Sequence, residues 1–145
     1  IGFCDGSATQ RFRAERGAAH QALLRVDHLV LHTGSAQACI DLFEQRLGLR
    51  LALDKDAPEW GGRMLFFRSG KLTLEIIEPA KDKPEHDFFW GIAYQCADIE
   101  DCLSRLGRAN VSASTARDGR KANTLVATVK SHHLGIPTLL VQPAV

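Results

Sequence analysis

Hydrophobic and polar residues alternate along residues 23–32 (LLRVDHLVLH), as in a half-buried β-strand. The alternation predicts one strand face with Val26, His28, Val30 and His32, and an opposite face with Asp27, Leu29 and Leu31. The pattern then changes to the spacing of an amphipathic helix that starts after a turn at Thr33–Ser35 and stops at Gly48. Its predicted buried stripe consists of Cys39, Leu42, Phe43 and Leu47.

The order of strand, helix and three strands occurs twice. In the first copy the three strands are predicted at 49–53, 63–68 and 72–78. In the second copy a strand at 89–96 precedes a helix with Asp98 as its N-cap, and the last three strands are predicted at 111–115, 124–130 and 137–142. The polar stretch 117–123 is predicted to be a turn. The two copies align with an offset of about sixty residues, which predicts a duplicated unit.

The pattern divides the chain into a βαβββ module at 23–80, a second module at 88–143, and an N-terminal arm or linker at 1–22. One module alone is too small to bury a good core, so the two are expected to pair. The chain has no initiator, because Met64 is its only methionine. Trimming explains this simply; the alternative is that the chain is part of a longer protein with another module pair before it.

Composition narrows the function classes. The 145 residues carry a formal net charge of +1, which gives no electrostatic footprint for nucleic acid or a membrane surface. Apolar runs are short, so no bilayer span is expected. The four cysteines show neither a Cys-x-x-Cys pair nor zinc-site spacing, and no secretory signal is visible. We therefore expect reduced thiols and a cytoplasmic protein.

The duplicated unit, opened by Val26-Asp27-His28 and closed by LEIIEP at 74–79, resembles the vicinal oxygen chelate superfamily, which includes glyoxalase I, bleomycin-resistance proteins, extradiol dioxygenases and methylmalonyl-CoA epimerase. The resemblance implies an α+β fold in which two paired βαβββ modules form an open cup from curled mixed sheets. It also implies that enzymes of this group hold a divalent metal in the cup, which substrate oxygens chelate. One such scaffold serves many reactions, so the resemblance does not specify one.

The resemblance places metal ligands on the first and last strands of each module. His28 and Glu75 occupy these positions in the first module. In the second module Gly91 stands where the group has His, and Leu139 stands where it often has Glu. A catalytic metal such as Zn, Fe, Mn or Ni normally needs about three protein ligands, so His28 and Glu75 alone leave the site degenerate. The alternative for both residues is a structural pairing within the sheet.

Other candidate ligand-binding residues have structural alternatives as well. Trp60 and Arg63 flank two glycines; they either hold a planar, acidic ligand or form a turn at the sheet edge. Gly91 either leaves room for an organic ligand or lets the modules pack closely. The cations Arg117, Arg120 and Lys121 either bind a phosphate or carboxylate, or form a solvated hairpin tip, which is the favoured interpretation.

The sequence thus predicts a protein that binds a small organic molecule in the cup, with His28, Glu75, Trp60, Arg63 and Gly91 as ligand-binding residues. The first alternative is a metal-dependent lyase, isomerase or dioxygenase that uses His28 and Glu75. The second is a structural or dimerisation module of a longer chain. A homodimer is plausible under the resemblance, and no interface motif identifies one.

Overall fold

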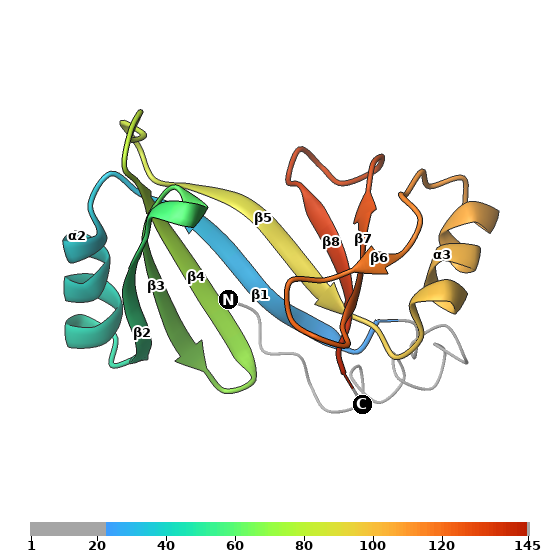
Figure 1. Ribbon diagram of the computed structural model, residues 1–145, viewed down its shortest axis with the longest axis horizontal. Coiled ribbons are helices and arrows are strands. Elements are labelled where there is room, and N and C mark those ends of the chain that lie inside the picture. Colours follow the sequence, from blue (N-terminus) through green and yellow to red (C-terminus); the bar gives the residue numbers. More distant parts are fainter. Residues whose placement is uncertain (1–22, 145) are drawn as a thin grey trace, which may run out of the picture.

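The computed structural model describes residues 23–144, except for the side chain of Trp60. In this part eight strands form a single sheet in the order β2-β3-β4-β1-β5-β8-β7-β6 (Figure 1). The strands are β1 (Arg25–His32), β2 (Arg50–Ala57), β3 (Gly62–Ser69), β4 (Leu72–Pro79), β5 (Phe88–Gln95), β6 (Arg117–Asp118), β7 (Leu125–Val129) and β8 (Thr138–Gln142). The predicted arm at 1–22 lies outside the described residues.

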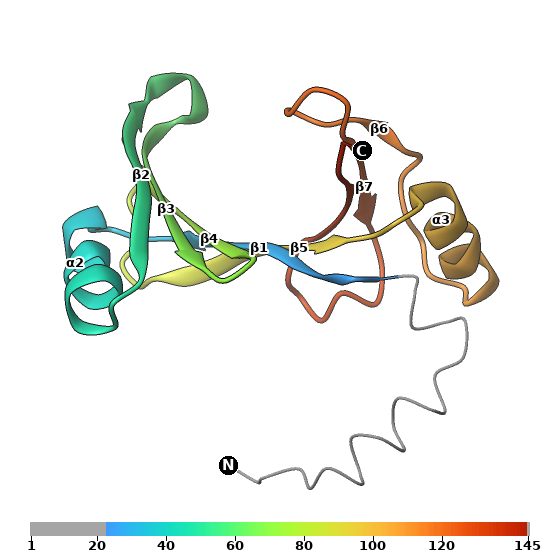
Figure 2. The ribbon, with the colours of Figure 1, turned by 90° about the horizontal axis from the view of Figure 1, so that it is seen from below.

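The strand order shows the duplication directly. In the first module β1 runs parallel to β4, and in the second β5 runs parallel to β8; the central strands β1 and β5 pair antiparallel and join the two halves. The sheet curves so that β2 and β3 rise on one side of the central strands and β6 and β7 on the other, with the helices outside (Figure 2). The predicted α+β class, with paired modules and an open, curled sheet, is confirmed.

Each helix covers a separate core on the convex face of the sheet. The first helical segment consists of α2 (Ala36–Ile40), capped by Ser35, and a π-helical continuation η2 (Asp41–Arg46). It packs on the fully buried Leu65, Phe67 and Ile76. Helix α3 (Ile99–Arg108) packs on a second core that includes Cys102, Ala127 and Leu140.

Several sequence predictions are wrong, and the first concerns the helix. Leu42 and Leu47 were expected in the buried helix stripe, yet they are 43% and 61% exposed. The π-helical winding, with a Leu47 N–H bond to the Leu42 carbonyl at 2.9 Å, changes the helical period and turns them away from the sheet.

The second wrong prediction is the strand at 111–115. That segment makes only a single bridge, Ala113 to Val129, beside the sheet. The Ser114 hydroxyl accepts the Thr128 N–H at 2.9 Å, so a side chain takes the place of a ladder partner. The short strand β6 forms instead at Arg117–Asp118, at the start of the stretch predicted to be a turn.

Candidate functional site

The concave face of the sheet carries the side chains that point away from both helices. Paired residues on neighbouring strands share a face, so the strand registers define rows that run across the sheet. One row, which we name the histidine row, crosses all strands from β2 to β7 and consists of Arg50, Arg68, Thr73, His28, Ala93, Leu139 and Thr128. The next row consists of Leu53, Phe66, Glu75, Val30 and Gly91. His28 and Glu75 therefore lie in adjacent rows on adjacent strands.

A β-bulge sets the geometry of His28. Between Val26 and His28 the register with β5 shifts by one residue, so Asp27 is inserted beside His28. In a regular strand, adjacent side chains point to opposite faces; here the Asp27 Oδ2 lies 2.8 Å from the His28 Nδ1. The bulge also turns Val26 away from the face predicted for it, because its partner Tyr94 packs in the core under α3.

The contact with Asp27 fixes the imidazole ring. A carboxylate that accepts from Nδ1 favours the tautomer with the proton on Nδ1. In this tautomer Nε2 carries no proton and is a hydrogen-bond acceptor. His28 is 20% exposed and Asp27 is 33% exposed. This arrangement presents an oriented imidazole to a molecule on the concave face.

Glu75 lies partly buried in the middle of β4. Its desolvation raises the pKa of the carboxyl, while the charges of His28 and Arg120 lower it and that of Asp27 raises it. Arg120 belongs to the segment between β6 and β7, so a charge from the second module acts on a carboxyl of the first. A carboxyl in this setting can both accept and donate a hydrogen bond as its protonation changes.

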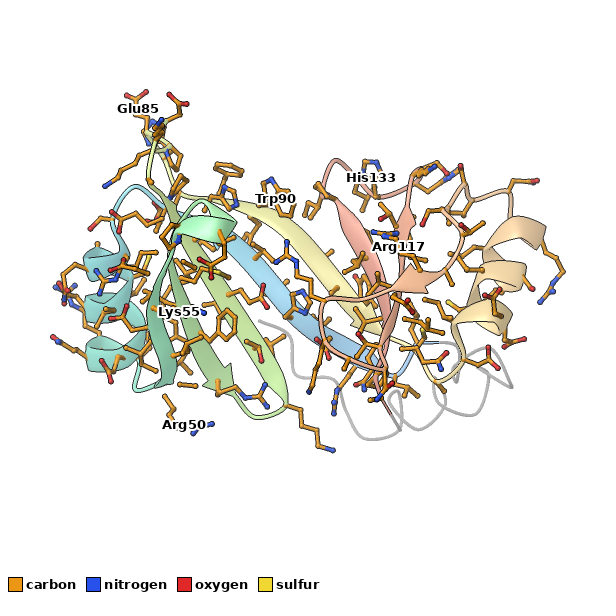
Figure 3. All side chains as sticks on the ribbon, in the orientation of Figure 1. Arg50, Lys55, Glu85, Trp90, Arg117 and His133 are labelled. Carbon is orange, nitrogen blue, oxygen red and sulfur yellow. The ribbon has the colours of Figure 1, made fainter. Side chains whose placement is uncertain are left out.

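Aromatic rings surround the far end of β1. His32 stacks on Trp90, with ring centroids 5.4 Å apart and planes 5° apart, and it contacts Phe88 at 5.3 Å. His32 pairs with Ile77, which places it on the concave face beyond the Glu75 row. Trp90 is 50% exposed, and Figure 3 shows its indole at the start of β5. One ring face of this cluster is thus free to hold an apolar or planar group.

Arg63 does not join this group. It pairs with Glu78 on the convex face and donates two hydrogen bonds to Asp54, at 2.9 and 2.7 Å. Gly91 does lie on the concave face opposite Val30, and a side chain there would meet the Pro137 carbonyl oxygen at 3.3 Å. The role predicted for Trp60 concerns a side chain outside the described structure.

The sequence matches the family model for the Glyoxalase/Bleomycin resistance protein/Dioxygenase superfamily over residues 25–132. The chain belongs to this superfamily. A search of curated proteins finds no match.

Solved structures of the superfamily fold agree with this assignment. A methylmalonyl-CoA epimerase from Mycobacterium tuberculosis superposes with a TM-score of 0.67 at 19% identity, covering 91% of this chain and 96% of that one. A hypothetical protein from Bacillus halodurans gives 0.65 at 18% identity, with 83% and 95% covered. The Streptomyces coelicolor epimerase bound to 2-nitronate-propionyl-CoA gives 0.63 at 17%, with 86% and 100% covered. At these identities the likeness shows the shared fold.

The donor set does not fit the divalent metal centre implied for glyoxalase-superfamily enzymes. Among residues 23–144 no group of three or more His, Cys, Asp and Glu side chains is placed to hold a metal ion. His28 and Glu75 come from the first module, but the matching strands of the second present Gly91 and Leu139. Asp27 is engaged by the His28 ring. Two donors are fewer than a catalytic site normally needs.

Sequence reasoning missed two elements of the site. Asp27 was placed on the opposite face, because nothing local in VDH signals a bulge. Arg68 was not considered, although its guanidinium donates to Thr73 in the histidine row. Only the pairing of β3 with β4 brings it there.

Proposed function

We propose that this glyoxalase-superfamily protein binds a small organic molecule on its concave face without a metal ion. The observation that carries the proposal is the asymmetry of the two modules at the centre of the sheet. The first module supplies the polar anchors His28 and Glu75, whereas the second supplies the small or apolar Gly91, Ala93 and Leu139. These residues offer no metal donor where a chelating family member would place ligands, so an organic molecule here would be anchored by the first module alone.

The surroundings suit a ligand with an apolar or aromatic part. Leu53 and Phe66 lie in the row of Glu75, and Trp90 stacks on His32 one row further on. Aromatic surface provides much of the burial, while a few polar groups fix the orientation of the ligand. Structural neighbours with the same fold are epimerases solved with coenzyme A derivatives, which supports binding of a small molecule by this scaffold.

The test combines elemental analysis with thermal unfolding. Protein purified without a metal-affinity tag is analysed for Zn, Fe, Mn and Ni, and a panel of small aromatic compounds is then screened for an increase in Tm, with and without a chelator. We expect sub-stoichiometric metal and Tm increases that survive the chelator. The increases should be lost in His28→Ala and kept in His86→Ala, whose histidine lies exposed in the loop before β5.

Two outcomes would overturn the proposal. Near-stoichiometric metal that is lost in His28→Ala would establish the metal-dependent alternative. A metal-free protein that no compound stabilises would favour a structural role. Sedimentation in the same buffer tests the homodimer, which stays a prediction.

A further inference from the structure

Charged residues on the strands divide by face. According to the strand registers, the concave face carries two carboxylates, Asp27 and Glu75. It also carries five Arg and Lys residues: Arg25, Arg50, Lys55, Arg68 and Arg117. The convex face of the strands carries one arginine, Arg63, and four carboxylates: Asp54, Asp56, Glu78 and Asp118. The overall charge of +1 therefore conceals an uneven distribution on the strands, whose concave side chains carry a net positive charge and whose convex side chains carry a net negative charge.

Two of the concave guanidinium groups have neutral partners. Arg68 donates to the Thr73 hydroxyl and to the Gly70 carbonyl. Arg117 donates to the hydroxyls of Ser114 and Thr128, at 3.1 and 3.0 Å. By contrast, the convex Arg63 is held by the carboxylate of Asp54. Hydroxyl and carbonyl partners orient a guanidinium without neutralising its charge, so both groups keep the capacity to bind an anion.

These two arginines flank the histidine row. Thr73, which Arg68 contacts, is the row neighbour of His28 on one side; Thr128, which Arg117 contacts, lies in the same row beyond Ala93 and Leu139. The sheet curves into two walls of strands on either side of β1 and β5 (Figure 2), and Figure 3 shows Lys55 on one wall and Arg117 on the other. Arg120, in the segment between β6 and β7, lowers the pKa of Glu75, so one cation of the second module lies near the centre of the face.

We infer that the ligand is a small organic anion whose carboxylate or phosphate group lies beside His28 on the concave face, attracted by the guanidinium groups of Arg68 and Arg117. This inference rests on the proposed function and adds the chemical class of the ligand. The aromatic or apolar part of the molecule lies along Phe66 and toward Trp90. An acid near His28 lies between cations on both walls of the curved sheet (Figure 2), and a guanidinium donates strong charge-assisted hydrogen bonds to a carboxylate or a phosphate.

Aromatic compounds of similar shape, with and without a negative charge, test whether the protein selects anions. Binding of benzoate, phenyl phosphate and benzamide is measured by isothermal titration at low and at moderate salt. We expect at least one of the two anions to bind, benzamide to bind about tenfold more weakly or not at all, and the affinity of the anion to fall as salt rises. Comparison of benzoate with phenyl phosphate identifies which acid the face prefers.

Substitutions of the two arginines test whether the anion binds on the concave face. Arg117→Gln and Arg68→Gln are each expected to weaken the anion by about tenfold or more, since each loses charge-assisted hydrogen bonds. Arg117→Lys keeps the charge and should lose less. Arg46→Gln, an exposed position on η2 outside the sheet, is the control with the same loss of charge and should bind like the parent protein.

The result also separates this inference from the proposed function. Benzamide binding as tightly as the anions, or Arg117→Gln and Arg68→Gln behaving like Arg46→Gln, overturns the anion inference and leaves the proposed function standing. If none of the probes and no compound of the wider aromatic panel binds, both fail. Circular dichroism of each variant confirms that a lost affinity is not lost folding.

Discussion

Replacing Glu75 by Gln should stabilise the protein at neutral pH. Burial raises the pKa of the Glu75 carboxyl, so the folded state holds this proton more tightly than the unfolded chain does. The raised pKa means that the ionised form costs stability, and that this cost disappears as pH falls through the folded pKa. Gln keeps the shape without the charge. We therefore expect the free energy of unfolding to rise on the order of 1 kcal/mol at about pH 7.

Glu78 provides a control with the opposite sign, three residues along the same strand and on the other face. Its Oε1 accepts a hydrogen bond from the Lys83 ammonium at 2.7 Å, and its Oε2 accepts the Ala36 N–H at 2.9 Å, so its pKa is lowered. A lowered pKa gives stability that is present above the unfolded pKa and is lost as pH falls. Glu78→Gln should therefore destabilise by about 1 kcal/mol at about pH 7.

Urea unfolding of the parent protein and the two variants at about pH 7 and about pH 4 measures both effects. Near pH 4 the Glu75 carboxyl, whose pKa is raised, is mostly protonated in both states, so the effect of Glu75→Gln should shrink toward zero. The pKa of Glu78 is lowered, so its carboxyl stays largely ionised in the folded state and the effect of Glu78→Gln should shrink less. Destabilisation by Glu75→Gln at neutral pH would refute the reasoning, because it would show that the folded protein stabilises the Glu75 anion. Such a result would also revive the metal-dependent alternative, in which Glu75 is a ligand.

Three further substitutions test the fold, each by urea unfolding. Phe67→Ala empties a fully buried site in the first core and should cost about 3–5 kcal/mol. Gly62→Ala places a Cβ 2.1 Å from the Glu78 carbonyl oxygen, so it should cost more than about 2 kcal/mol by displacing β3 from β4. Asp98→Ala removes the cap that accepts the Asp101 N–H at 3.0 Å and should cost about 1 kcal/mol, with faster hydrogen exchange in the first turn of α3.

The parts of the fold that the sequence predicted depend on local signals. Alternation located β1, and turn signals bounded β3 and β4. The turn at Thr33–Ser35 and the N-cap Asp98 marked the two helix starts, and the side chains of Ser35 and Asp98 both accept a backbone N–H there. The repeated order of elements then implied the paired modules. The parts that failed depend on packing. The π-helical winding of η2 has no local marker. The segment at 111–115 has backbone bonds to β7, but the Ser114 hydroxyl takes the place of one backbone acceptor and the pairing stops at a single bridge.

The candidate site was predictable only in part for the same reason. His28 and Glu75 came from the resemblance, and the registers put both on the concave face. Asp27 depends on a bulge created by the pairing of β1 with β5, a contact between residues far apart in the chain. Arg63, a candidate anchor for which a structural turn was the alternative, pairs with Asp54 across a hairpin that forms only when β2 and β3 align.

The distribution of charge was visible in the sequence, but its meaning required the sheet. In β2, Asp54, Lys55 and Asp56 alternate in sign, and Arg117 precedes Asp118 in β6. Alternation in a strand sends opposite charges to opposite faces, so a chain with nearly zero net charge can build a positive face and a negative one. Which face is which depends on where α2 and α3 pack. A net charge of +1 is therefore compatible with a concave face that binds small anions.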